Sequence, residues 1–284
     1  MYKVSKEIQY DRLEIHWLNT ARLRKLCILV FGYDPECENF DQTPYHENEV
    51  GAQNCVTLAA AGASEVPIAE NPNVTHSRFT VNATCFSDKE RIMRDDLPYV
   101  EPMYKYDGDV VKERLQRYIR SCGYPKWLSV TTSPSGSYRE HHILDFLETH
   151  LPVKSACRRW SLMFADDYGP HKGDNAFNLS WERNYVMNPH GGGVTPVSQV
   201  PDTDLNQHLR HDYKEEESAI LIKKLRLGDK VPKMSPEESI DCFVRVCSQK
   251  QLHLNAADGY KKTAHTVALD GIEDYLITRE AKKA

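Results

Sequence analysis

The 284-residue sequence lacks the long hydrophobic segments that would place a protein in or across a membrane. Its apolar runs all stop short of the roughly 18 residues that indicate a membrane-spanning helix. The first residues, MYKVSKEIQY, contain no apolar core of the kind that a secretory signal needs. We therefore expect no membrane partner and no secretion, and a location in the nucleus or the cytosol. The sequons at Asn73, Asn82 and Asn178 are then chance matches.

The sequence also lacks two common binding motifs. Eight cysteines occur, but no two of them form a Cys-x-x-Cys pair, so neither a cysteine zinc site nor a disulfide framework is indicated. The glycine-rich loop Gly191–Gly193 is not followed by Gly-Lys-Ser/Thr, which excludes a nucleotide-binding P-loop. We expect reduced, buried thiols and a flexible glycine loop.

An excess of positive charge is missing as well. The 36 lysines and arginines are outnumbered by 41 acidic residues, which gives a net charge of −5. Contacts from Lys and Arg to phosphates supply most non-specific affinity for DNA, so this balance disfavours a strong stand-alone DNA binder. An active site built from carboxylates is itself acidic until metal binds, so a metal-dependent nuclease stays compatible with the composition.

An apolar run that ends in two acids is the most informative stretch of the sequence. Leu162–Ala165 is followed directly by Asp166 and Asp167, and Gly169 and Pro170 mark a turn. This pattern predicts a buried strand that emerges at a sheet edge. A carboxylate there stands on rigid backbone, which suits a metal ligand. Because neighbours on a strand face opposite sides, only one of the two acids can easily reach the metal.

Three motifs in this order resemble the DDE superfamily of endonucleases, specifically the mariner/pogo-type transposases. The motifs are Asp41 within NFDQTP, Asp166-Asp167 followed by His171, and Thr195, Gln199 and Asp202 followed by Arg210 and Tyr213-Lys214. The resemblance implies an α/β fold, in which an RNase H-like mixed sheet is flanked by helices. It also implies a helix-turn-helix DNA-binding domain upstream, which we expect to be absent from this chain.

The resemblance further implies a catalytic triad of Asp41, Asp166 and Asp202. Carboxylates are hard oxygen donors, so the expected cofactors are two Mg²⁺ or Mn²⁺ ions, bridged by Asp41. The expected reaction is in-line attack of water or a DNA 3′-hydroxyl on a phosphodiester. DNA is the expected partner, and the chain is expected to form a homodimer on it.

Several of these residues have alternative interpretations. Asp41 also suits the first position of an Asx turn before Thr43-Pro44, and Asp202 suits a helix N-cap. Asp204 competes with Asp202 as a metal ligand, although the register from Gln199 selects Asp202.

Two residues of the middle motif stay open in the same way. Asp167 stands where the family usually has Asn, and it is the weaker alternative to Asp166. The extra negative charge can raise a neighbouring pKa. His171 either contacts the scissile phosphate or ends the turn.

Periodicity and turn signals divide the chain into three parts. We expect an N-terminal helical linker at 1–32, an RNase H-like catalytic domain at 33–228, and a C-terminal helical extension at 229–284. The expected elements are listed by residue range: strands at 37–41, 55–61, 78–86, 127–132, 162–165 and 185–188, and helices at 5–29, 109–121, 138–150, 175–183, 201–227, 253–260 and 271–281, with a further helix opened by the capping box Ser235-Pro236-Glu237-Glu238.

Two functional hypotheses follow. The first is a metal-dependent, transposase-like endonuclease and strand transferase that uses the Asp-Asp-Asp triad. The second is a transposon-derived nuclear binding or interaction module that no longer cuts, which the negative net charge and Asp167 favour. Convergence of the three carboxylates is the geometric condition that the first hypothesis must meet.

Overall fold

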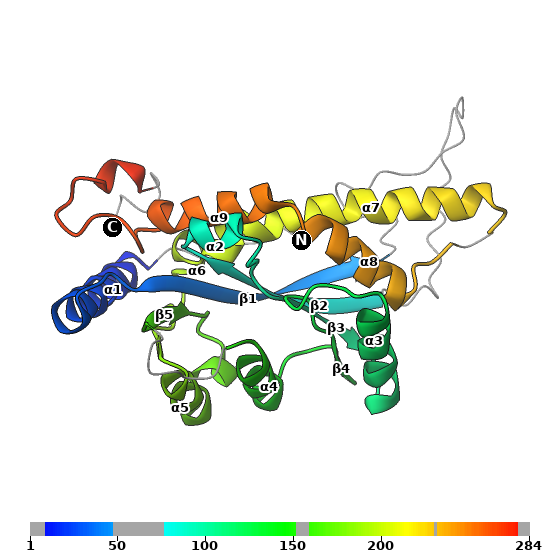
Figure 1. Cartoon of the computed structure of the whole chain (residues 1–284), viewed down its shortest axis with the longest axis horizontal. Coiled ribbons are helices and arrows are strands. Elements are labelled where there is room, and N and C mark those ends of the chain that lie inside the picture. Colours follow the sequence, from blue (N-terminus) through cyan, green and yellow to red (C-terminus); the bar gives the residue numbers. More distant parts are fainter. Residues whose placement is uncertain (1–8, 48–76, 152–158, 230–231, 278–284) are drawn as a thin grey trace.

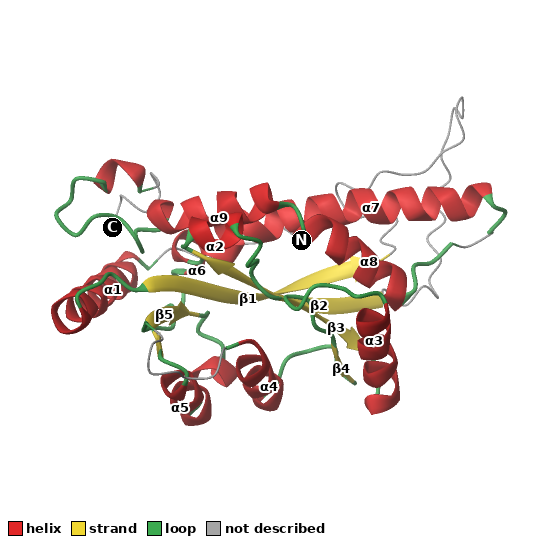
Figure 2. Ribbon diagram, viewed as in Figure 1, coloured by secondary structure: helices red, strands yellow, loops and turns green. Residues whose placement is uncertain are grey.

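A six-stranded mixed sheet forms the centre of the molecule (Figures 1 and 2). The computed structural model describes residues 9–47, 77–151, 159–229 and 232–277. The strands are β1 (Glu36–Glu47), β2 (Ser77–Phe86), β3 (Val100–Lys105), β4 (Thr131–Ser133), β5 (Ser161–Phe164) and β6 (Tyr185–Met187). Their order across the sheet is β4-β3-β2-β1-β5-β6.

The topology is that of an RNase H-like fold, as predicted. Strands β1, β2 and β3 form an antiparallel meander. Strand β5 then returns to the other side of β1 and pairs with it in parallel, and β6 pairs in parallel with β5. Strand β1 therefore lies inside the sheet, between an antiparallel and a parallel neighbour, and its backbone is fixed from both sides.

Helices cover both faces of this sheet. In Figure 1, α7, α8 and α9 lie on one face, and α4 and α5 lie on the other. The helices are α1 (Tyr10–Phe31), α2 (Lys89–Met93), α3 (Asp109–Ser121), α4 (Glu140–His150), α5 (Asp174–Glu182), α6 (Thr195–Ser198), α7 (Asn206–Arg226), α8 (Pro236–Cys247) and α9 (Lys250–Lys262). Three short turns complete the described elements: the 3₁₀ turns η1 (Gly169–Lys172) and η3 (Asp274–Leu276) and the π-helical turn η2 (Pro201–Leu205).

Alternation along β1 divides the core into two layers, because successive side chains of a strand point to opposite faces. Cys37 and Tyr45 belong to the cluster that also contains Phe243 of α8 and Tyr260 of α9. Phe40 belongs to a second cluster with Phe146 of α4. Odd-numbered residues of β1 thus face α7, α8 and α9, and this face includes Asp41.

Helices α8 and α9 pack on the same core as the sheet. The Ser235 side chain caps α8 by accepting a hydrogen bond from the Glu238 backbone, and Glu238 reaches back to the Ser235 backbone. This is the capping box predicted from the sequence. Both helices contribute fully buried side chains to the core cluster that β1 and β2 line.

Some local expectations need correction. Strand β3 falls in a stretch expected to be polar and mixed, and the strand expected at 127–132 is confined to β4 with one isolated bridge at Leu128. In the described part of 271–281, the expected helix is only the turn η3. The helix expected from Pro201 begins as the π-helical turn η2. The strand expected at 55–61 lies outside the described residues.

Helix α1 packs with a different face from the one that its leucines indicate. Its buried residues are Leu13, His16, Thr20, Arg24 and Cys27. Leu18 and Leu26 are exposed. The buried face is thus largely polar, because it meets polar groups of the later chain. None of the helices among the described residues is both long and apolar enough to span a membrane.

Candidate metal centre

Two aspartates, one on β1 and one just after its parallel neighbour β5, lie close enough for their charges to interact. The register of β1 and β5 pairs Asn39 with Phe164. Two residues further along each chain are Asp41 and Asp166, and parallel strands lie about 4.8 Å apart. Asp166 lies two residues beyond the end of β5, and its charge acts on the Asp41 carboxylate. The fold therefore places these two carboxylates next to each other at the end of β5.

The third aspartate joins them through Asn206, the first residue of α7. The Nδ2 atom of Asn206 donates a hydrogen bond of 2.8 Å to Oδ2 of Asp41 and one of 3.2 Å to Oδ1 of Asp202. Asp202 lies in η2, four residues before Asn206, so both side chains project from the same side of the helical turns. A single amide group thus links the carboxylates of β1 and η2.

Asp41 is the most deeply buried member of the three. Its side chain lies almost entirely out of solvent. Burial, together with the negative charges of Asp202 and Asp166, raises the pKa of Asp41 to about 7. Hydrogen bonds from Gln199 and Asn206 act in the opposite direction. The carboxylates of Asp202 and Asp166 therefore both repel that of Asp41, a repulsion that divalent cations would relieve.

Gln199 lies beside Asp41 with an amide that is fully buried. Its side chain precedes η2 and acts on the Asp41 carboxylate as a hydrogen-bonding group. No hydrogen bond of regular geometry satisfies either its Oε1 or its Nε2. A buried amide in this condition is uncommon, because an unpaired polar group costs about 1–3 kcal/mol. The Gln199 amide is therefore available to a group that enters the centre.

Asp166 is the exposed member, with 34% of its side chain accessible. Its Oδ1 accepts a 3.2 Å hydrogen bond from the Tyr168 backbone and lies 2.6 Å from Nδ1 of His171. His171 is completely buried, and the oblique approach leaves both of its ring nitrogens without a regular hydrogen bond. Its ring packs edge-on against Phe40. His171 thus contacts Asp166 from the buried side of the centre.

Asp167 and Asp204, the two alternative acids, form ion pairs with other residues. Lys172 Nζ lies 2.7 Å from Oδ1 of Asp167 at the surface. Asp204 accepts a hydrogen bond from the Thr203 hydroxyl and contacts Lys262 of α9. Its carboxylate packs so tightly on Gly259 that a Cβ there would lie 2.7 Å from Oδ2. Among the predicted acids, Asp41, Asp166 and Asp202 are brought together, while Asp167 and Asp204 form ion pairs elsewhere.

The oxygen donors of the three aspartates fit hard divalent cations, and Asp41 is the ligand that two such ions would share. Among the described residues, oxygens from all three carboxylates do not lie within 4.8 Å of one another. A two-ion arrangement does not require this, because Asp41 can share one ion with Asp166 and another with Asp202. Mutual repulsion also holds like charges apart until a cation arrives. The buried, unpaired amide of Gln199 and the raised pKa of Asp41 are the structural signs that agree with a cation.

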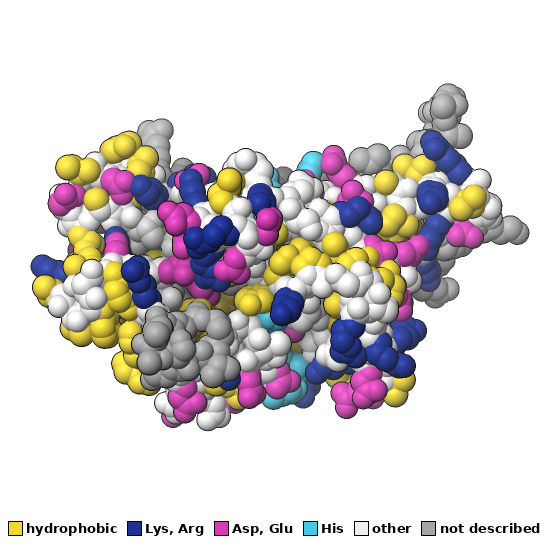
Figure 3. Space-filling model, in the orientation of Figure 1, with side chains coloured by type: hydrophobic (Ala, Val, Ile, Leu, Met, Phe, Trp, Pro, Cys, Tyr) yellow, Lys and Arg dark blue, Asp and Glu magenta, His cyan; other side chains and the backbone are white. Residues whose placement is uncertain are grey.

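Sequence reasoning missed Asn206, although its spacing of four from Asp202 was a usable signal. It named Arg210 as a basic residue of the third motif, but not Arg12 or Lys172. Arg210 donates to the Asn206 carbonyl, and Arg12 of α1 donates to the Gly192 carbonyl. With Lys172, these residues place positive charge near the three aspartates. Elsewhere, basic and acidic side chains are interspersed on the face that Figure 3 shows.

A cleft of about 1060 Å³ lies next to this region but is separate from the three aspartates. Of the predicted site residues it is lined only by Asp204, together with His208 of α7 and Lys261 and Lys262 of α9. Its other charged lining residues include Asp88, Glu90 and Asp258. The mixture of charge signs does not single out one class of ligand.

The topology and the three gathered aspartates define an RNase H-like α/β domain. Among solved structures, the chain is similar to complexes of Mos1 transposase. The Mos1 strand transfer complex has a TM-score of 0.44 and 11% identity, over 90% of this chain and 65% of that chain. For a pre-cleavage Mos1 transpososome the TM-score is 0.38 and the identity 11%, and for the Mos1 mariner paired end complex with Mn they are 0.37 and 10%. These two matches cover 90% of this chain and 66% of the other.

The chain therefore spans about two thirds of the length of these transposase chains. No protein-family model and no curated protein sequence matches it. The solved structures to which it is similar come from the mariner type of transposase, which is the type that its three sequence motifs resemble.

Proposed function

We propose that this chain is a metal-dependent, transposase-like DNA endonuclease and strand transferase. The observation that supports it most is the link made by Asn206, whose amide joins the carboxylates of Asp41 and Asp202 beside Asp166. Three aspartates from β1, η2 and the end of β5 are costly to gather, because burial and like charge both disfavour ionisation. Binding of divalent cations would offset the cost of holding these carboxylates together.

Asp41, Asp166 and Asp202 would hold two Mg²⁺ or Mn²⁺ ions, with Asp41 shared between them. When bound, such ions activate an attacking hydroxyl group and stabilise the leaving oxygen of a phosphodiester. Asn206 keeps Asp41 and Asp202 oriented, His171 supports Asp166, and Gln199 offers a free amide to an entering group. Asp41 and its hydrogen-bond partners are excluded from bulk water, which strengthens each of these interactions.

DNA is the proposed substrate, and a homodimer on DNA in the nucleus is part of the same proposal. Arg12, Lys172 and Arg210 lie around the acidic centre, where cations would attract a phosphate backbone. The overall charge of −5 implies that this attraction is local. Affinity for DNA should therefore be modest without the metal and fall steeply as salt is added.

One observation favours a second function, that of a non-catalytic binding module. Asn206 already satisfies part of the hydrogen-bonding need of two carboxylates without any cation. A chain that had lost catalysis could keep its fold with this arrangement. The two functions differ in whether the centre binds Mn²⁺ and whether binding is accompanied by DNA nicking.

The test combines Mn²⁺ calorimetry with nicking of supercoiled plasmid on the same samples. We expect Asp166→Asn and Asp41→Ala to reduce nicking by more than about 100-fold, because even partners of metal ligands contribute 10- to 100-fold. Asp167→Asn is the matched control, since Asp167 pairs with Lys172, and it should keep both activities. A wild type that neither binds Mn²⁺ nor nicks DNA would support the binding module, and unchanged nicking in Asp41→Ala would refute the nuclease.

A further inference from the structure

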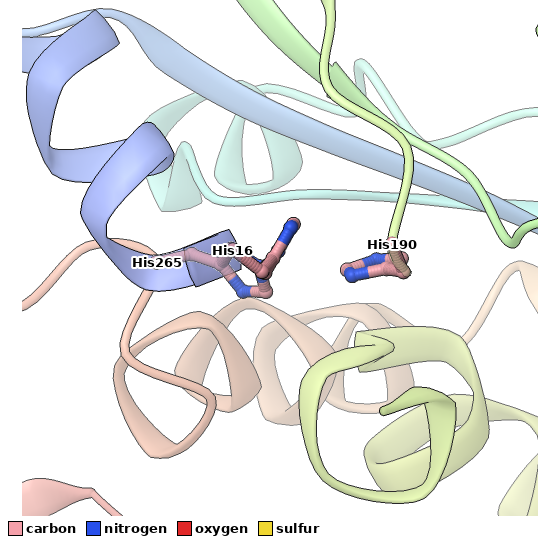
Figure 4. A group of neighbouring side chains, drawn as sticks. All are labelled: His16, His190 and His265. Carbon is pink, nitrogen blue, oxygen red and sulfur yellow. The ribbon is translucent and has the colours of Figure 1, made fainter. Parts of the chain in front are cut away.

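Three buried histidines from distant parts of the chain meet on one side of the sheet (Figure 4). His16 comes from α1, His190 follows β6, and His265 follows α9. One ring nitrogen of each lies within 4.8 Å of the others. Their exposed fractions are 4%, 0% and 0%. None of these residues belongs to the acidic centre.

Hydroxyl groups fix the protonation of two of these rings. The Ser198 hydroxyl donates to the Val194 carbonyl, so its oxygen accepts from Nδ1 of His190. The Thr263 hydroxyl likewise donates to the Gly259 carbonyl and accepts from Nδ1 of His265 at 2.7 Å. Each ring therefore carries its proton on Nδ1 and keeps a lone pair on Nε2. A metal-binding histidine is commonly oriented in this way, by a hydrogen bond from the ring nitrogen that does not touch the metal.

The lone pairs point to a shared position. Nε2 of His16 donates a 3.0 Å hydrogen bond to the lone pair on Nε2 of His265, and an ion at this position would replace that bond. Nitrogens bound to one tetrahedral Zn²⁺, at about 2.0–2.1 Å each, are separated by roughly 3.3 Å. A small opening of the ring pair is enough to admit an ion, provided that His16 carries its proton on Nδ1. The three rings are packed at tilted and edge-on angles rather than in one stack.

Burial keeps the three rings in the neutral form that binds metal. It lowers the pKa of His16 to about 4 and those of His190 and His265 well below the usual range. Neutral imidazole is a preferred ligand of zinc and related transition metals, and a poor one for Mg²⁺. Nε2 of His190 is also 3.1 Å from Nδ2 of Asn39, whose own Oδ1 has no hydrogen-bond partner. The Asn39 amide nitrogen donates to Nε2 of His190, so an entering ion would displace this hydrogen bond, and the rotated amide oxygen or a water can then complete the coordination.

We propose that His16, His190 and His265 form a structural site for one divalent transition-metal ion of the zinc class. The ion connects α1 and the segment after α9 to the end of β6. This connection explains why α1 buries a histidine while several of its leucines face solvent. The proposed ion also lies next to β1, because Asn39, which contacts His190, belongs to that strand. The proposal does not depend on nuclease activity.

The test is the metal content of the full chain, purified without a polyhistidine tag and without added chelator. We expect about one zinc per chain, and replacement by Co²⁺ should give the strong visible absorption of a tetrahedral site. His190→Gln and His265→Gln should each lower the metal content at least 10-fold. A chelator strong enough to remove the ion should lower the midpoint of thermal unfolding, and added Zn²⁺ should restore it.

Two histidines outside the cluster provide control variants. His253→Gln removes a buried histidine that bonds only the Cys247 carbonyl, so it should keep the zinc. His211→Ala removes a ligand of the exposed group His211, Asp212 and Glu215, and it too should leave the content unchanged. If the histidine variants fail to fold, the Co²⁺ spectrum of the wild type still decides. A wild type without zinc, without a tetrahedral Co²⁺ spectrum and without stabilisation by Zn²⁺ would overturn the proposal.

Discussion

The acidic centre and the histidine cluster are neighbours on one face of β1, yet they differ in every property that determines metal binding. Asp41 anchors the first and Asn39 reaches the second, two residues apart. The acidic centre offers oxygen ligands and opens to solvent at Asp166, which is 34% exposed. The histidine cluster offers nitrogen ligands and is closed to solvent. The acidic centre would suit a cation that binds and leaves with substrate. The histidine cluster would suit a permanently bound structural ion.

This contrast follows from where each site lies relative to the strand ends. Asp166 comes just after β5, where the sheet stops and its carboxylate emerges. The histidines are covered by α1 and by the segment after α9, with Phe164 packed against the His265 ring. Hard, exposed oxygens favour Mg²⁺ or Mn²⁺, and buried imidazoles favour zinc. The two proposed sites therefore differ in the class of metal that their donor atoms prefer.

The largest effect that separates the two sites is expected from Asn206→Ala. The change removes the amide that holds Asp41 and Asp202, so nicking should fall by about 10- to 100-fold, as for other partners of metal ligands. The zinc content and the Co²⁺ spectrum should not change, because Asn206 does not contact the histidines. Plasmid nicking and metal analysis on the same samples check this. A parallel loss of zinc would show that the sites are coupled.

The acidic centre was largely predictable from the sequence because its signals are local. Asp166 follows an apolar run, and Asp202 follows a motif that contains Gln199, so each acid carries its own context. The capping box at Ser235 was predictable for the same reason. In contrast, His16, His190 and His265 are separated by long stretches, and only the closure of α1 and the C-terminal segment over β5 brings them together. His142 is likewise buried at the start of α4, where it accepts a hydrogen bond from the Arg139 backbone.

A substitution that affects both sites is Gly259→Ala in α9. Its new Cβ would lie 2.7 Å from Oδ2 of Asp204 and 3.0 Å from Val200. Crowding of this kind costs about 1–3 kcal/mol of stability. It would displace η2, which carries Asp202, and α9, which leads to Thr263 and His265. We expect a lower free energy of unfolding in urea, together with weaker Mn²⁺ binding.

The control for this change is Ala257→Gly in the same helix, which removes a methyl group without crowding η2. It should cost about 1 kcal/mol through helix propensity and about 0.8 kcal/mol more through the lost buried methyl group, and leave Mn²⁺ affinity unchanged. If Gly259→Ala is as stable as the wild type, the contact between α9 and η2 does not constrain the acidic centre.

The smallest effect is expected at the far end of β1, where neither metal site should respond. Glu36 and Glu38 share the guanidinium of Arg91, at 2.6 and 3.0 Å. Burial and the charge of Glu38 raise the pKa of Glu36 from 4.5 to about 7 in spite of Arg91. A raised pKa in the folded state means that stability is full below about 4.5 and is lost as pH rises through about 7.

Glu36→Gln should remove this dependence. The variant should match the wild type near pH 5 and exceed its free energy of unfolding by about 1 kcal/mol near pH 8, since one pKa unit corresponds to about 1.4 kcal/mol and the neutral amide keeps only a weaker bond to Arg91. Urea unfolding across this pH range measures it, with Glu90→Gln on exposed α2 as the control. Equal pH slopes in the variant and the wild type would mean that Arg91 keeps Glu36 ionised. Zinc content and nicking should stay constant in this variant. Glu36 lies at the start of β1, and paired residues of that strand separate it from the three aspartates.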